Sequence, residues 1–199
     1  PSVETLLHAF LPHKFVYHTH STAILGLVDQ ENSEEICREV YGNTFGFVPY
    51  IMPGFDLAKA AAEVFEQDTS VIGLILDKHG IFTFGDTAEE AYTRMIDAVT
   101  KAEEYIAKGK KPAAPKAALP ASVAKPADIA PTLRGAVAVD KGEGHFDRMI
   151  SDFRVSDAIL DFLSSSKLGE LAASGVSTPD LSIRIKTGPM ALPAPEAGK

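Results

Sequence analysis

Short apolar runs with strand character alternate with helical patterns from Ser2 to about Lys108, and this alternation constrains the fold of the chain more than any other feature. Residues 71–76 form an aliphatic run typical of a buried strand, whereas residues 56–67 carry apolar side chains at helical spacing. In chain order we expect a helix from Ser2 to near Pro12, a strand over 14–18, helices over 22–28 and 33–41, a strand over 47–52, a helix over 56–67, strands over 71–76 and 81–84, and a helix from the Asp86-Thr87 cap to about Lys108. The pattern predicts one domain of mixed helices and strands.

Composition changes abruptly after Gly109. Residues 110–131 are rich in Ala, Pro and Lys, which is typical of an extended linker without a core of its own. Residues 146–163 carry enough apolar side chains for one or two amphipathic helices that need a surface to pack on, and 168–173 reads as a short helix. We therefore divide the chain into a first domain over 1–109, a linker over 110–145, and a helical segment over 146–199 that docks on the first domain or belongs to a part outside this sequence.

The charge and cysteine content exclude several classes of partner. The chain has 199 residues and a net charge of −8, which argues against binding to nucleic acid or to an anionic membrane, because phosphate groups need clustered Lys and Arg. The single cysteine, Cys37, cannot form an internal disulfide, and no apolar run approaches the length of a membrane span. We expect a soluble cytoplasmic protein whose partner is a small molecule or another protein.

Two histidines, His18 and His20, stand one residue apart at the end of the first predicted strand. Alternate side chains of a strand point to the same side, so the two imidazoles can be presented to one point. An isolated pattern of this kind also occurs as an ordinary pair of half-buried histidines. The β-branched and aromatic residues that precede the pair favour a metal site.

A third histidine, His79, ends the strand-like run over 71–79. Three histidines on strand ends satisfy the commonest catalytic zinc arrangement, in which a fourth position stays open for water or substrate. Such a metal is a Lewis acid that can polarise a carbonyl and stabilise an enolate oxygen. Gly80 follows His79 directly, and we expect it to let the chain turn sharply there, because glycine tolerates positive φ. We predict a zinc site formed by His18, His20 and His79.

Proton transfer beside such a metal needs an acid or base, and Glu4 is the best candidate by position. A short loop over 12–14 returns the first helix to the strand that ends at His18. The alternative is a first-turn glutamate that the helix dipole favours. His8, one turn along the same helix, either hydrogen-bonds to Glu4 or packs. The remaining two histidines lie in a turn and in a Gly-rich loop and are expected to be solvated: His13 and His145.

Ordered motifs over about 1–108 resemble those of the class II aldolase/adducin family. They are Pro1-Ser2-Val3-Glu4 with His8, His18-Thr19-His20, Leu76-Asp77-Lys78-His79-Gly80, and the segment over 85–91. Other segments resemble one subgroup, the aldolase-like half of bifunctional rhamnulose-1-phosphate aldolase/alcohol dehydrogenase proteins, in which a short-chain dehydrogenase half with a Rossmann fold follows. These segments are 8–14, 49–58, and Thr178-Pro179-Asp180 with Arg184 and Lys186.

The resemblance implies an α/β fold, a three-layer α/β/α sandwich with a mainly antiparallel central sheet. It also implies zinc on His18, His20 and His79, with Glu4 as the acid/base. The implied reaction is retro-aldol cleavage of the C3–C4 bond of a ketose 1-phosphate, such as rhamnulose 1-phosphate, to dihydroxyacetone phosphate and an aldehyde. Negative charge develops on the enediolate, and a preorganised cation stabilises the reaction most at that position. Family members are commonly tetramers, so the resemblance implies a homo-oligomer.

The chain departs from the family pattern at both ends. It begins at the glutamate motif, without the preceding segment whose Gly-Asn and Ser-rich turns cradle the substrate phosphate in the family. It ends before any Gly-rich nucleotide loop or Tyr-x-x-x-Lys pair. We therefore expect the chain to be part of a longer protein, in which NAD would act only through a dehydrogenase domain downstream of this sequence.

Two other functions are compatible with the resemblance. A sugar-phosphate epimerase uses the same metal and the same retro-aldol step but recloses the bond on the other face. An aldolase-like module can also serve mainly to assemble subunits, as adducin does, within a dehydrogenase. An assembly module has no need to keep Glu4 and the three histidines together, so their joint presence favours a metal site.

Overall fold

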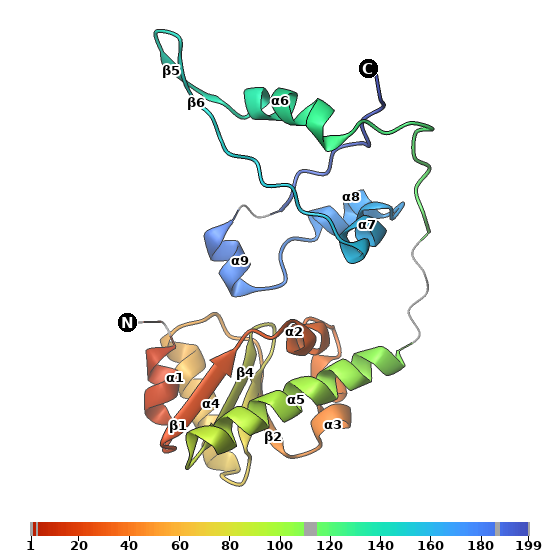
Figure 1. The fold of residues 1–199 in the computed structure, drawn as a ribbon. Coiled ribbons are helices and arrows are strands. Elements are labelled where there is room, and N and C mark those ends of the chain that lie inside the picture. Colours follow the sequence, from red (N-terminus) through yellow and green to blue (C-terminus); the bar gives the residue numbers. More distant parts are fainter. Residues whose placement is uncertain (1, 3, 110–114, 186–187, 199) are drawn as a thin grey trace. The chain divides into compact units, whose positions relative to one another are not determined.

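The computed structural model describes residues 2, 4–109, 115–185 and 188–198 (Figure 1). Its parts form two compact units, one made of Pro1–Lys111 with Val176–Thr187 and the other of Pro112–Gly175 with Gly188–Lys199. Pro1, Val3 and Lys186, which belong to the motifs quoted above, lie outside the described residues. The candidate metal ligands all belong to the first unit.

A four-stranded sheet forms the centre of the first unit. Its strands are β1 (Phe15–Thr19), β2 (Phe45–Val48), β3 (Gly73–Leu76) and β4 (Gly80–Gly85), in the spatial order β1-β4-β3-β2. The β1–β4 and β3–β4 pairs are antiparallel and the β2–β3 pair is parallel, so the expected mainly antiparallel sheet is confirmed. The strand expected over 47–52 is displaced to 45–48, because Pro49 has no backbone N–H with which to continue the ladder.

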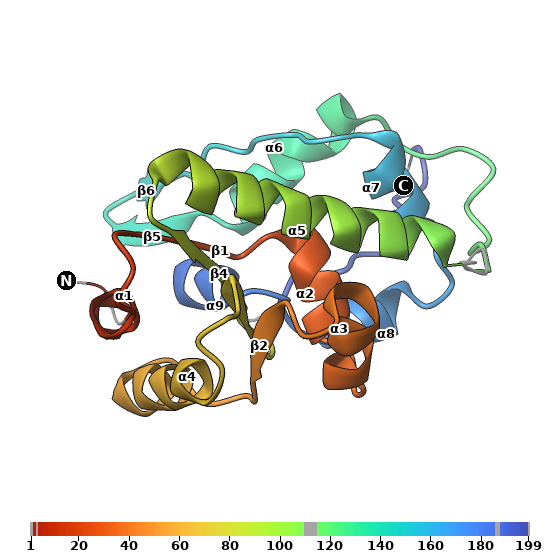
Figure 2. The same ribbon diagram turned by 90° about the horizontal axis from the view of Figure 1, so that it is seen from below.

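Helices cover both faces of the sheet, which confirms the three-layer α/β/α arrangement. One face packs against α1 (Thr5–Phe10) and α4 (Phe55–Gln67), and the other packs against α2 (Thr22–Val28), α3 (Ser33–Tyr41) and α5 (Ala88–Lys108). Figure 2 shows α4 and α5 on opposite sides of the strands.

The side-chain alternation of β3 and β4 builds these two cores. Leu74, Leu76, Phe82 and Phe84 belong to the core beneath α1 and α4, whereas Ile75 and Ile81 belong to the core beneath α2, α3 and α5. Burial of each large apolar side chain contributes about 1.5–3 kcal/mol.

Thr87 begins α5 as predicted. Its side-chain hydroxyl accepts a hydrogen bond from the Glu90 backbone N–H at 3.1 Å, which satisfies one of the N–H groups at the start of a helix. The helix is 21 residues long and its buried stripe contains only small and flexible side chains, namely Ala91, Met95, Ala98 and Ala102. These residues let α5 lie close against the sheet.

The remaining elements follow α5 in the chain. They are α6 (Pro126–Ala136), β5 (Val139–Gly142), β6 (His145–Asp147), α7 (Asp157–Leu163), α8 (Leu168–Ala173) and α9 (Pro179–Arg184). Helix α8 has the predicted bounds. Helix α6 and the β5–β6 hairpin lie mostly within the segment expected to be a linker. Helix α6 has no buried residue, and its sequence therefore lacks the one-sided apolar face from which a helix is predicted.

The segment over 146–163, expected to hold one or two amphipathic helices, contains one, α7 (Asp157–Leu163). Residues 145–147 pair with β5 across the turn formed by Glu143 and Gly144, both at positive φ. The helix begins only after Ser156, whose hydroxyl accepts from the Ile159 N–H at 3.3 Å. Local turn and cap chemistry thus prevails over apolar spacing. Among the residues that the structure describes, no helix is both long enough and apolar enough to cross a bilayer.

Cys37 provides a test of the packing around α3. Its side chain is 4% exposed, and burial, with smaller contributions from the charges of Asp77 and Glu34, raises the pKa of the thiol to about 12. We expect Cys37 in the native protein to react with a disulfide reagent at pH 8 roughly 10³-fold more slowly than an ordinary thiol, because the thiolate is the reacting form. Absorbance of the released thiol measures the rate. Unfolding in guanidinium should expose the single thiol, and fast labelling without denaturant would contradict the buried position.

Candidate metal centre

Three histidines meet at one end of the sheet because of how β1 pairs with β4. The strands are antiparallel with Thr19 opposite Ile81, so the last residues of β1 adjoin the first residues of β4. His18 lies on β1 and His20 directly follows it, whereas His79 directly precedes β4. The strand periodicity that the sequence predicted therefore places the three rings together.

The four predicted site residues form one cluster. One donor atom from each of Glu4, His18, His20 and His79 lies within 4.8 Å of every other. The Nε2 atoms of His18 and His20 are 2.9 Å apart, and the three ring centroids are 4.7–5.2 Å apart. Imidazole nitrogens bound tetrahedrally to one zinc at 2.0–2.1 Å would lie roughly 3.3 Å apart. The donor set therefore fits a single zinc ion after small adjustments.

His18 is held in the orientation and tautomer that a metal ligand needs. Its Nδ1 lies 3.0 Å from the Ile81 carbonyl oxygen, and because a carbonyl only accepts, Nδ1 carries the proton and Nε2 keeps its lone pair. The ring stacks on Phe82 with centroids 4.1 Å apart. Burial lowers the pKa of His18 to about 4, although the Ile81 carbonyl and Glu4 oppose the shift. The imidazole is therefore neutral at neutral pH, which is the form that binds metal.

Glu4 faces the point where the histidines converge. Its Oε1 lies 3.5 Å from Nε2 of His79, 3.6 Å from that of His18 and 4.0 Å from that of His20. Glu4 precedes α1, but its side chain makes no capping hydrogen bond. Instead Oε2 accepts a hydrogen bond from the Ser2 hydroxyl at 2.9 Å.

The surroundings of Glu4 favour its ionised form. Burial raises the pKa of the carboxyl, but the hydrogen bond from Ser2 and the three histidines, when protonated, together outweigh burial. The pKa of Glu4 therefore lies below its ordinary value, and the group is a carboxylate at neutral pH. A carboxylate directed at the convergence of three imidazoles is a favourable place for a divalent cation.

The other histidines are placed outside this cluster. His8 is exposed and packs edge-on against Phe82 with centroids 5.3 Å apart, which supports its packing alternative. The expectation of a solvated His13 is wrong, because its ring is half-buried and stacks on Phe84 at 4.1 Å. His145 lies exposed on β6, as expected.

Gly80 serves close approach, not the sharp turn that we expected. The positive φ, +53°, falls on Lys78, and Gly80 instead lies in β4 against β1. A Cβ at this position would lie 2.5 Å from the Thr19 carbonyl oxygen and 2.9 Å from Cδ2 of His20. The absence of a side chain at Gly80 therefore lets the two histidine-bearing segments come together.

Sequence reasoning missed the groups that orient the ligands. The Ile81 carbonyl and the Phe82 ring lie opposite His18 only because of the β1–β4 register, which no local pattern encodes. Ser2 gave a local signal, since a serine two residues before an acid commonly hydrogen-bonds within the same turn. These contacts complete the surroundings of the four predicted residues.

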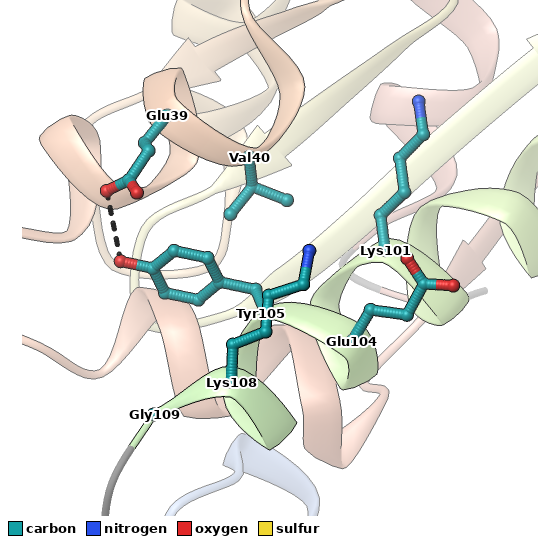
Figure 3. A pocket seen from close by; sticks show the side chains of 7 residues that line it. All are labelled: Glu39, Val40, Lys101, Glu104, Tyr105, Lys108 and Gly109. Atoms are coloured by element: carbon teal, nitrogen blue, oxygen red, sulfur yellow. Dashed lines mark hydrogen bonds between the residues drawn. The ribbon is translucent and has the colours of Figure 1, made fainter.

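A surface pocket of about 540 Å³ lies between α3 and α5, and the four clustered residues are not part of its lining. Figure 3 shows Tyr105 directed towards Glu39, to which its hydroxyl donates a hydrogen bond of 3.1 Å. The other charged groups of the lining are of both signs: Lys101, Glu104 and Lys108. They do not form a convergent set of ligands, so we place the candidate chemistry at the histidines.

Two families of known proteins match the sequence. The family described as "Class II Aldolase and Adducin N-terminal domain" matches residues 1–106, and "Aldolase class II, second domain" matches residues 124–199. The first match covers more than half of the chain, so the chain belongs to the class II aldolase and adducin family. Class II aldolases are metal-dependent, are generally lyases, and typically bind small sugar phosphates.

The chain is similar to individual members in different measure. It is 36% identical over 200 residues to the uncharacterized oxidoreductase YuxG of Bacillus subtilis (strain 168). The matched region covers 96% of this chain but only 28% of that protein. It is 46% identical to the N-terminal class II aldolase domain of a conserved protein from Thermoplasma acidophilum, with 53% and 48% of the two chains covered and a TM-score of 0.49. It is 23% identical to a sugar-phosphate aldolase from Thermotoga maritima, with 56% and 57% covered and a TM-score of 0.45.

The close approach at Gly80 yields a testable prediction. Gly80→Ala should push β1 away from β4, destabilise the protein by about 1–3 kcal/mol and weaken zinc binding roughly tenfold. Guanidinium unfolding and competition with a chromophoric chelator measure the two effects. Gly26→Ala in α2 is the matched control, since its Cβ would meet only the flexible end of Ile106 at 3.2 Å. Equal effects of the two substitutions would contradict the role assigned to Gly80.

Proposed function

We propose that this chain supplies the zinc-dependent aldolase site of a bifunctional aldolase/dehydrogenase. The reaction is retro-aldol cleavage of a ketose 1-phosphate, resembling rhamnulose 1-phosphate, to dihydroxyacetone phosphate and an aldehyde. The observation that carries the proposal is the convergence of Glu4 with His18, His20 and His79 in a member of the class II aldolase family.

The three imidazoles would hold the zinc ion, with Glu4 beside it. Three histidine nitrogens are the ligand set of many catalytic zinc sites, and they leave a further position for substrate. When bound, the zinc supplies Lewis-acid chemistry, which stabilises negative charge on substrate oxygens. Burial of His79, with 2% of its surface exposed, and the neutral state of His18 both suit that role.

Glu4 would move the proton. As a carboxylate it accepts the proton of the substrate hydroxyl on C4, while the C3–C4 bond breaks and its electrons form the enediolate of dihydroxyacetone phosphate. The same carboxyl, now protonated, returns the proton to C3 and completes the product. The proposed role is supported by the distances of 3.5–4.0 Å from Oε1 of Glu4 to the three histidine Nε2 atoms.

The dehydrogenase part of the proposal rests on the relatives. YuxG carries the name of an oxidoreductase and matches this chain over only 28% of its length. We propose that NAD acts in such a further portion, and that the protein works in the cytoplasm as a homo-oligomer. Light scattering of the purified full-length protein tests its oligomeric state.

The metal proposal has a direct test. We expect near-stoichiometric zinc in the purified full-length protein and its loss in His79→Ala, because two imidazoles hold zinc far more weakly than three. Plasma emission spectrometry gives the metal content. His145→Ala removes an exposed histidine outside the cluster and should keep the metal. A wild-type protein that binds no zinc even after incubation with it would refute the proposal.

The proton-transfer role of Glu4 can be separated from metal binding. Glu4→Gln should keep zinc but release dihydroxyacetone phosphate about 10²–10⁴-fold more slowly, as loss of a general base does. A coupled assay with glycerol-3-phosphate dehydrogenase follows the product. Because the pKa of Glu4 is lowered, the rate should fall only as pH drops below the ordinary glutamate range.

Four outcomes would point elsewhere. Unchanged cleavage by Glu4→Gln would refute its role, and loss of zinc would make Glu4 a ligand. An epimeric ketose phosphate formed without release of dihydroxyacetone phosphate would identify an epimerase instead. Failure of every candidate ketose 1-phosphate with a zinc-loaded protein would favour the assembly module.

A further inference from the structure

We propose that Ser33 and Asp77 are positioning residues for the metal site. Their hydrogen bond anchors the β3–β4 turn and so fixes His79 relative to the other ligands. The inference rests on the proposed metal-binding function and extends it to residues outside the cluster.

The β3–β4 turn is short and strained. Three residues, Asp77-Lys78-His79, connect Leu76 of β3 to Gly80 of β4, and the His79 backbone N–H donates to the Leu76 carbonyl at 3.2 Å. Lys78 has a φ of +53°, which costs a residue other than glycine about 1 kcal/mol or more. Contacts around the turn must therefore stabilise this conformation.

Asp77 provides those contacts on both sides of the turn. Its backbone N–H donates to the Val48 carbonyl of β2 at 2.9 Å. Its Oδ1 accepts a hydrogen bond of 2.7 Å from the Ser33 hydroxyl, and its Oδ2 lies 3.4 Å from the Lys78 ammonium. Asp77 thus connects the turn to β2 and to α3.

The Ser33–Asp77 hydrogen bond is well shielded from water. Ser33 is 5% exposed, and the Asp77 side chain is 13% exposed. A hydrogen bond to an ionised group in such surroundings is stronger than one on the surface. Ser33 is the first residue of α3, where the helix dipole also favours a nearby carboxylate. A contact on the protein surface would have neither the shielding from water nor the favourable helix dipole of α3. The Ser33–Asp77 hydrogen bond is therefore suited to anchor the β3–β4 turn.

The positive charge of Lys78 lies beside the two acids nearest the Ser33–Asp77 hydrogen bond. Asp29, at the end of α2, is the second acid near it: burial raises the pKa of Asp29, the positive charge of Lys78 opposes this shift, and Asp77 adds to it. Lys78 therefore compensates two carboxylates at the ends of two helices. The strained residue is held by electrostatics as well as by the backbone.

His79 lies two residues beyond Asp77 in this short turn. Any displacement of Asp77 is transmitted to the His79 ring, whose centroid lies 4.8 Å from that of His20 and 5.2 Å from that of His18. Groups that orient metal ligands typically change metal affinity 10–100-fold when removed. Loss of the anchor should therefore alter the metal site before it unfolds the protein.

The test compares four variants of the full-length protein: Ser33→Ala, Asp77→Asn, the double variant and Ser70→Ala. The last is the matched control, since Ser70 likewise donates to an aspartate, Asp68, at 2.5 Å but lies in an exposed turn before β3. Chelator competition gives zinc affinity, and the visible spectrum of the cobalt-substituted protein reports ligand geometry.

We expect Ser33→Ala and Asp77→Asn each to weaken zinc binding roughly tenfold and to change the cobalt spectrum. The double variant should bind zinc no more weakly than the more weakly binding single variant, because Ser33→Ala removes, and Asp77→Asn weakens, the same hydrogen bond. Ser70→Ala should match the wild type. Wild-type zinc affinity and spectrum in Ser33→Ala would overturn the inference.

Hydrogen exchange separates this inference from the proposed function. In the metal-free protein, Ser33→Ala should speed exchange of the His79 amide at least about tenfold, because the turn that protects it opens more often. Unchanged exchange would overturn the anchor. Faster exchange in a protein that binds no zinc would establish the anchor and refute the metal site alone.

Discussion

The antiparallel pairing of β1 with β4 is the constraint on which the rest of the site depends. It sets Thr19 opposite Ile81 and so brings His20 and His79 together at one end of the sheet. A slip of one residue would turn every side chain of β1 to the other face and would move His18 into the wrong layer. The absence of a side chain at Gly80 allows the approach, since a Cβ there would fall 2.5 Å from the Thr19 carbonyl. The geometry of the candidate metal centre therefore depends on the strand register as well as on its four residues.

Electrostatics at the sheet end complement that geometry. Buried polar groups cost stability unless they find partners, and here one ionised carboxylate faces three imidazoles, of which His18 is strongly biased to the neutral form by burial. The Ile81 carbonyl and the Phe82 ring orient His18, and its Nε2 faces that of His20 at 2.9 Å. Without a metal this arrangement costs folding stability, whereas a bound divalent cation would stabilise it. Functional sites commonly depart in this way from the rules that stabilise a core.

Local signals were enough to predict much of the fold, and together with the family resemblance they predicted all four clustered residues. Helices α2, α3 and α8 have the predicted bounds, because caps and apolar spacing act over a few residues. Two histidines two positions apart on a strand share a side whatever the fold, so half of the cluster was visible in the sequence. Sequence reasoning failed where distant contacts decide: His13 stacked on Phe84, and positive φ fell on Lys78 rather than Gly80. Each depends on register or packing that no short window contains.

The errors around His79 have a common physical origin. The left-handed residue, the strand contact without a side chain, and the hydrogen bond from α3 all lie within three residues of that ligand. A short turn that presents a buried imidazole cannot also have relaxed backbone geometry, so the strain moves to Lys78 and the neighbouring helix supplies the contact that holds it. Strain concentrated at one ligand and absent from the regular strand that bears His18 indicates that His79 is the least freely placed of the three. The geometry of the proposed metal centre then depends on α3, an element that contributes none of its four residues.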